Sequence, residues 1–396
     1  MNFLIRLFRR ETSSNEFIPE IDGLRFLAIA MVVLFHLFQV ISDNSASLEF
    51  TDHPVSRSTI PNILLFGYQG VQLFFVISGF VLAMPFMRFY LGLGGRKILL
   101  KEYFLRRLTR LEPPYIISLI GFFLLAWYFG RNTIEVLVPS LFWSLFYLHN
   151  IAFPGDLPYI SGVTWSLEIE VQYYILAPLI TWAVCCIRNK FQRRLIIFIL
   201  IIVFAILSWF IQVVLEIKTI SLALYLQYFF CGILLCDLYL LENKDTKYLN
   251  SLPVFVLGLV LLSLIVGTEH TGSRSLLLRL ASPLIIFGFY AIVFWHAWWR
   301  RVFRLTILTL IGGMCYTIYL LHHAIISTVA RHSVRQLHIS EYYLFFLIQA
   351  TILLLFVVLI SSMYFLLIEK PCMKKNWPSK LYEHIKYRLL TDNVSR

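Results

Sequence analysis

The first long apolar stretch of the chain, residues 24–42, contains side chains that could perform acid–base chemistry. Arg25 and His36 are eleven positions apart, close to three helical turns, so they share a helix face and lie about 16 Å apart along it. Asp22 precedes Arg25 by one turn on roughly the same side. A neutral imidazole at mid-depth can take a proton from a hydroxyl, so His36 is a candidate general base, with Asp22 as a candidate catalytic neighbour. The alternative is a histidine that only hydrogen-bonds a neighbouring helix.

A second candidate site lies in the segment WSLEIEVQYY, which begins another apolar stretch. Glu170 would lie roughly 10 Å below one membrane face by helical rise, and a carboxylate at that depth is a candidate catalytic group because facing lipid is costly. Trp165 opens the segment and is a candidate substrate contact. Ser78 could also contact substrate, although the pair Ser78-Gly79 is equally typical of close helix packing. Glu170 could instead pair with a buried arginine.

Two arginines, Arg107 and Arg110, lie one turn apart in RRLTRLEPPY, directly before an apolar run. The guanidinium fork binds phosphate oxygens in pairs, so this cluster is a candidate phosphate site. The alternative is that it only anchors a basic loop at the membrane. The segment YTIYLLHH contributes three further candidate substrate contacts, with its histidine toward the outer end of the run: Tyr316, Tyr319 and His322.

The composition places these side chains in a membrane. Of 396 residues, 59% are hydrophobic and 14% are charged, against roughly 25% charged in an ordinary soluble protein, and the mean hydropathy is +0.77. The net charge of +12 does not indicate nucleic-acid binding, because the basic residues lie in short loops between apolar runs. The six cysteines show neither metal-ligand spacing nor a disulfide framework, so we expect no metal site.

Ten stretches contain enough apolar residues, about 20, to span a bilayer as helices. They cover residues 24–42, 68–87, 114–130, 163–185, 194–214, 220–241, 252–268, 276–297, 305–329 and 342–367. An eleventh run at 136–149 has 14 residues and contains a proline, which favours a re-entrant or interfacial segment. The fold class expected is therefore all-α, a polytopic integral membrane bundle.

The basic residues orient this bundle. With the N-terminus in the cytoplasm and loops on alternate sides, 26 of the 34 lysines and arginines fall inside and 7 outside, as the positive-inside rule requires. Both termini are then cytoplasmic. We expect a cytoplasmic segment at 1–20, a membrane domain at 21–371 and a basic cytoplasmic tail at 372–396, in the cytoplasmic (inner) membrane.

Taken in order, these segments resemble the acyltransferase 3 family of membrane O-acyltransferases. The family has a basic residue followed, after ten intervening positions, by a histidine, and Arg25 and His36 match this pattern. Its arginine pair matches Arg107 and Arg110. Its FFxxSGF block matches residues 74–80, and WSLxxExxFY matches 165–174 with Tyr where Phe is usual. SYxxYLxH matches 315–322 with Cys in place of Ser, and Glu-Lys-Pro at 369–371 resembles the closing ExP.

The resemblance implies transfer of an acyl group, most often acetyl from acetyl-CoA, to hydroxyls of an extracytoplasmic glycan, lipopolysaccharide or another cell-surface acceptor. Membrane lipids would be further partners, and no nucleic acid is expected. The CoA phosphates would lie on Arg107, Arg110 and Arg25. Because the chain ends about 25 residues after Glu369, it resembles the stand-alone form without an extracytoplasmic hydrolase-like domain.

The mechanism we expect is direct attack of the acceptor hydroxyl on the thioester with His36 as base. A two-step route through an acyl-enzyme stays open. Outside this class, intramembrane His, Arg and Glu side chains also build transporters and proton-coupled carriers, although the chain lacks repeat symmetry and a matched pair of interrupted helices. A binding or sensing membrane protein without turnover is the third possibility.

Overall fold

The computed structural model describes residues 6–10, 17–46, 48, 50, 62–130, 132–242, 249–269, 273–374 and 377. Every regular element among these residues is helical, which confirms the expected all-α class. The basic tail expected at 372–396 and the N-terminal segment expected at 1–20 lie largely outside the described residues.

Seven helical segments in the described part of the chain are long and apolar enough to cross a membrane. They contain α2 (Pro19–Ser45), α4 (Gly70–Tyr90), α5 (Leu100–Tyr128), α8 (Trp165–Cys186), α9 (Lys190–Trp209), α12 (Leu276–Trp295) and α16 (Tyr342–Tyr364). The helices α14 (Thr306–Gly313) and α15 (Cys315–Gln336) meet at a bend of 70° and make an eighth if the bent pair is counted as one span. The polytopic membrane bundle is therefore confirmed.

Two of the ten expected spans are shorter than the sequence suggested. α10 (Leu226–Leu241) and α11 (Leu252–Gly267) have 16 residues each, which is about 24 Å of helix and short of a bilayer core of about 30 Å. Before α10 the chain forms a separate short turn at Leu222–Leu224. The run with the internal proline forms α6 (Ile134–Leu145), a 12-residue helix packed on α5, as expected for a segment too short to span.

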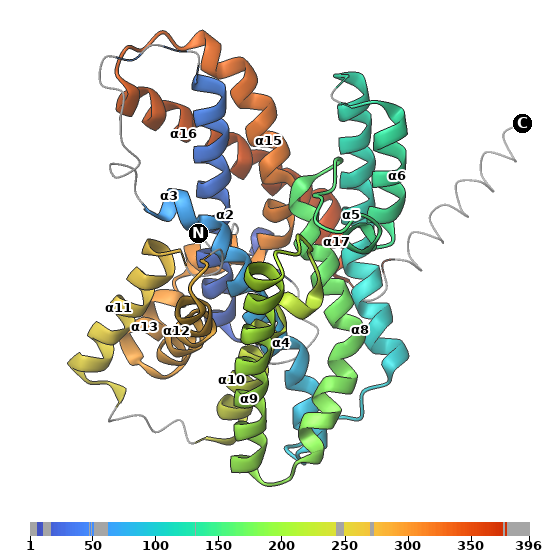
Figure 1. Cartoon of the computed structure of the whole chain (residues 1–396), viewed down its shortest axis with the longest axis vertical. Helices are drawn as coiled ribbons and strands as arrows, with labels where there is room; N and C mark the ends of the chain where they lie inside the picture. The colour runs from blue at the N-terminus through green and yellow to red at the C-terminus, as the bar shows by residue number, and fades with distance from the viewer. Residues whose placement is uncertain are drawn as a thin grey trace, which may run out of the picture.

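The centre of the bundle is formed by α2 and α4, which pack against each other and against the helices around them. Figure 1 shows α8, α9 and α10 in the lower part of the molecule, α5 and α6 at the upper right, and α15 and α16 at the top. The turns between α5 and α6 and between α15 and α16 lie at the upper end, whereas the turn between α8 and α9 lies at the lower end. This alternation agrees with the loop allocation used for the charge count.

Glycines allow the closest helix contacts at the centre. A Cβ added to Gly79 of α4 would lie 2.2 Å from the carbonyl oxygen of Phe229 in α10, and one added to Gly232 would lie 2.2 Å from the carbonyl oxygen of Val76. Only glycine permits backbones to approach this closely. The Ser78-Gly79 pair thus has the packing role considered above, because its glycine fixes α4 against α10.

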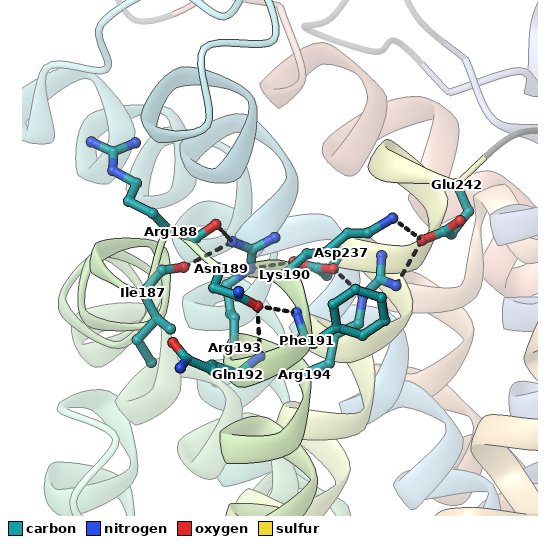
Figure 2. A network of polar contacts seen from close by, with 10 residues as sticks. All are labelled: Ile187, Arg188, Asn189, Lys190, Phe191, Gln192, Arg193, Arg194, Asp237 and Glu242. Carbon is teal, nitrogen blue, oxygen red and sulfur yellow. Dashed lines mark hydrogen bonds and ion pairs between the residues drawn. The ribbon is translucent and has the colours of Figure 1, made fainter.

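A buried ion cluster joins the start of α9 to the end of α10 (Figure 2). Asp237 accepts hydrogen bonds from Arg193 Nε at 2.5 Å and from Arg194 Nε at 2.7 Å. Arg194 also donates to Glu242 at 2.7 Å, and the side chain of Asn189 caps the start of α9. Because Asp237 and Arg193 are almost fully buried, this cluster is costly to break and holds the two helices together.

Candidate active site

His36 of α2 and His322 of α15 form a side-chain pair inside the bundle. His36 Nδ1 lies 3.1 Å from His322 Nε2 and 3.0 Å from the carbonyl oxygen of Val32. His322 Nδ1 lies 3.0 Å from the carbonyl oxygen of Ile318 and 2.8 Å from that of Tyr319. The two imidazoles therefore form a chain of hydrogen bonds that begins at His36 and ends on the backbone of α15.

The hydrogen-bond partners of the two imidazoles show which nitrogen of each ring carries the proton. A carbonyl oxygen only accepts, so the carbonyls of Ile318 and Tyr319 require a proton on His322 Nδ1. In neutral His322 the lone pair is then on Nε2, which accepts a hydrogen bond from Nδ1–H of His36. The carbonyl of Val32 requires the same proton on His36. Nε2 of His36 is therefore unprotonated when the ring is neutral, which is the form that a general base needs.

His36 lies in the wall of a cavity of about 610 Å³. Trp165 and Tyr319, two of the residues expected to contact substrate, line the same cavity. The hydroxyl of Tyr319 lies 2.6 Å from Ser166 Oγ and donates to the carbonyl of Val163 at 3.0 Å, which fixes the ring in the wall. The volume is typical of small-molecule sites. A hydroxyl-bearing molecule in this cavity would have access to His36.

Glu170 lies one helical turn after Ser166 in α8, beside Ser78 of α4. Ser78 Oγ donates a hydrogen bond to Glu170 Oε1. Arg25 is close enough for its charge to interact with that of Glu170. Glu170 therefore accepts a hydrogen bond from a hydroxyl group and lies near a cation. This environment fits both a catalytic carboxylate and a carboxylate that pairs with a buried arginine.

Asp22 and Arg25 are joined by a third residue, Arg10. Arg25 Nη1 donates to Asp22 Oδ1 at 2.7 Å, and Arg10 Nε donates to Asp22 Oδ2 at 2.9 Å. Asp22 is 1% exposed. Burial, followed by the charge of Arg25, lowers the pKa of Arg10 to about 10. One buried carboxylate thus faces two guanidinium groups, which leaves an excess of positive charge at the start of α2.

Arg107 and Arg110 lie on α5 with different partners. Arg107 stacks on Tyr103, with its guanidinium carbon 3.6 Å from the ring centroid, and no carboxylate pairs with it among the described residues. Arg110 Nη2 lies 4.0 Å from Glu369 Oε1, and its buried Nε has no hydrogen-bond partner within the described part of the chain. Both guanidinium groups therefore keep donors available for an anion.

The structure divides the sequence-predicted residues into three connected groups. His36, Trp165 and Tyr319 line the cavity with His322 directly behind His36, Ser78 and Glu170 form a pair between α4 and α8, and Asp22 and Arg25 lie at the start of α2. Tyr316 is not in the cavity wall, because its hydroxyl donates to the carbonyl of Leu111 and ties α15 to α5.

His322 lies level with His36 rather than nearer the outer end of its span. The reason is the bend after α14, where the backbone of Gly312 packs directly on that of Asp22. Helix α15 therefore begins at Cys315, and His322 comes only two turns later. His322 is fully buried behind His36, and the adjacent His323 lies in the cavity wall instead.

Sequence reasoning missed several residues of this region. Arg10 was counted only as a basic residue of the N-terminal segment, and its contact with Asp22 has no signal in the sequence. Gln72, Gln227 and Arg279 line the cavity from three different helices. Arg279 carried a usable signal, since an arginine inside an apolar run is costly without a partner.

Comparison with known proteins identifies the family. Residues 18–368 match the family model described as an acyltransferase domain. A protein of Staphylococcus aureus (strain COL) named Putative O-acetyltransferase is 27% identical over 338 residues, which are 79% of this chain and 51% of that protein. The peptidoglycan O-acetyltransferase OatA of Listeria monocytogenes is 25% identical over 174 residues, which are 42% of this chain and 24% of that protein.

The chain spans about half the length of the first of these curated relatives. No solved structure matches the chain significantly. The family match, in contrast, covers nearly all of the membrane bundle, from the residue before α2 to the last turn after α16. The chain therefore belongs to the acyltransferase 3 family of membrane O-acyltransferases.

Proposed function

We propose that this protein transfers an acetyl group from cytoplasmic acetyl-CoA to a hydroxyl of an extracytoplasmic glycan. The observation that carries the proposal is the His36–His322 pair beside a cavity of about 610 Å³. The names of two relatives, Putative O-acetyltransferase and peptidoglycan O-acetyltransferase, support an acetyl group and a cell-wall acceptor. The membrane would be the cytoplasmic one, with both termini in the cytoplasm.

On the acceptor side, His36 acts as the general base. The hydroxyl oxygen attacks the thioester carbonyl carbon while its proton moves to Nε2 of His36. When the carbon–sulfur bond breaks, the imidazolium returns that proton to the departing thiolate, so the histidine is regenerated neutral. A general base of this kind typically contributes ~10²–10⁴-fold in rate.

In this mechanism His322 positions His36 and does not contact the acceptor. Its lone pair on Nε2 keeps the His36 proton on Nδ1, so the free lone pair of His36 is on Nε2. It also stabilises the imidazolium, because its Nε2 accepts from the charged ring. This role differs from the acceptor contact that the sequence suggested, and it is supported by the complete burial of His322.

On the donor side, the phosphates bind to arginines near the start of α2 and α5. Arg10, Arg25 and Arg110 are close enough for their charges to interact, and Arg107 lies one turn from Arg110. Phosphate oxygens suit such a cluster because each guanidinium offers paired donors. An extended pantetheine arm could cover the helical rise of about 16 Å from Arg25 to His36.

The decisive test is transfer by purified protein. Protein in detergent is incubated with acetyl-CoA labelled in the acetyl group and with a cell-envelope extract, and label in the glycan fraction is measured. We expect label in O-ester linkage, released by mild base, and none with His36→Gln. Uptake or exchange of label in vesicles without any acylated product would instead indicate a carrier, and donor binding without turnover would indicate a sensor.

A further inference from the structure

The cavity beside His36 contains a buried arginine that the proposed mechanism does not use. Arg279 lies in the first turns of α12 and is 9% exposed. Its Nε donates to the carbonyl of Ser273 at 2.7 Å, and its Nη1 donates to Gln212 Oε1 at 2.5 Å. Both partners are neutral. No carboxylate forms an ion pair with Arg279 in the part of the chain that the structure describes.

A buried guanidinium without a carboxylate is costly to keep in a membrane protein. The acidic group whose charge reaches Arg279 is Glu269, which is exposed and accepts a hydrogen bond from Tyr68 at 3.3 Å. Gln212 holds the guanidinium from the π-helical turn that follows α9. The side chain is thus fixed in the cavity wall by neutral groups, and its charge remains available to a ligand.

The rest of the lining fits a molecule rich in hydroxyl groups. Gln72 and Gln227 are each 4% exposed, and the Oε1 atom of each is buried without a hydrogen-bond donor among the described residues. Such acceptors are satisfied by hydroxyls of a bound molecule. Trp165 and Tyr225 line the same cavity, with ring centroids 5.4 Å apart, and offer apolar ring surface next to these amides.

We infer that the acceptor is a sugar that carries an anionic group, and that Arg279 binds this group while His36 deprotonates a hydroxyl of the same sugar. This inference rests on the proposed function for the identity of the cavity as the acceptor site. A carboxylate and a phosphate share the chemistry that Arg279 recognises, since both accept paired hydrogen bonds from guanidinium. The experiment separates these two sources.

Binding is measured without turnover, as the rise in thermal unfolding temperature of the purified protein with D-glucuronate, D-glucose 6-phosphate or D-glucose. A ligand that binds only the folded protein raises this temperature with its concentration. We expect at least one of the two anionic sugars to bind about ten times more tightly than glucose. Arg279→Gln should remove that difference and Arg279→Lys should retain part of it.

Arg274→Gln is the matched control, because Arg274 is five positions away, has a side chain 87% exposed and pairs with exposed Glu216 at 3.7 Å. It should behave like the wild type. Equal binding of the three sugars, no binding of any, or an unchanged preference in Arg279→Gln would overturn the inference. Acyl transfer that depends on His36 but not on acceptor charge would overturn it while leaving the proposed function intact. Preference for anionic sugars without any acyl transfer would overturn the proposed function and the acceptor role together, and would leave Arg279 only as the anion-binding residue of the cavity.

Discussion

His36 and His322 are separated by 286 positions, yet Nδ1 of the first lies 3.1 Å from Nε2 of the second. In the proposed mechanism, this contact determines which nitrogen of His36 is free to act as the base. It also joins α2 to α15 at the depth where the cavity lies. Most of the expected behaviour of the protein follows from this relationship and from the arginines at the start of α2 and α5.

Replacing His36 should remove turnover and leave donor binding intact. His36→Gln cannot accept and return a proton, so the rate should fall by ~10²–10⁴-fold, the contribution of a general base. The measurements are the turnover number with labelled acetyl-CoA and donor affinity by calorimetry. His332→Gln is the control, since His332 is exposed on α15 and its hydrogen bond among the described residues is to the Thr328 carbonyl. Near-full turnover in His36→Gln would exclude His36 as the base.

His322 should affect turnover without affecting acceptor affinity. In His322→Phe, His36 loses the acceptor that holds its proton on Nδ1, so kcat should fall while the acceptor KM changes little. His322→Gln should restore part of the activity, because an amide oxygen can accept from His36 Nδ1–H. If acceptor KM rose and kcat were unchanged, His322 would be a substrate contact, as its place in the family motif first suggested.

Donor affinity should depend on Arg107 and Arg110. Each change to Ala should weaken acetyl-CoA binding by about 1–3 kcal/mol, the range for a charge-assisted hydrogen bond, and Lys should substitute poorly because it lacks the planar fork. Arg106→Ala is the matched control, as Arg106 lies in the same turn, is half exposed and pairs with Glu102. Donor affinity is measured by calorimetric titration of each variant. If all the variants bound the donor as tightly as the wild type, Arg107 and Arg110 would be simple membrane anchors.

Ser78 distinguishes direct transfer from an acyl-enzyme. Its hydroxyl donates to Glu170, so Ser78 has a carboxylate partner that could in principle activate it. For direct attack we expect Ser78→Ala to retain most of the turnover, and intact-protein mass spectrometry after incubation with acetyl-CoA to show no added acetyl group. An acetyl adduct in the wild type that disappears in Ser78→Ala would establish the two-step route.

The ion cluster between α9 and α10 should stabilise the fold. Asp237→Asn leaves buried Arg193 and its neighbour Arg194 without their shared carboxylate, and breaking a buried pair costs about 3–5 kcal/mol. Glu216→Gln removes an exposed ion pair and should cost about 0–1 kcal/mol. Thermal unfolding in detergent compares the two variants, and a midpoint for Asp237→Asn equal to that of Glu216→Gln would contradict this role.

The sequence by itself determined the class of protein and the positions of most helices. A helix satisfies its own backbone hydrogen bonds, so a run of about 20 apolar residues is enough to predict a span. The shared face of Arg25 and His36 is equally local, because it follows from helical periodicity alone. The order of six short motifs predicted the family, and the family match confirms it.

Only the tertiary structure decided which of these side chains meet. The pairing of His36 with His322, the bridge from Arg10 to Asp22 and the position of Arg279 in the cavity all join residues far apart in the chain. Such contacts depend on the rotation and depth of one helix against another. Those are set by small packing residues, as where Gly312 lies on α2 and the span bends after α14. The hydropathy of a segment predicts that it lies in the membrane, but it does not specify the neighbour that each of its faces meets.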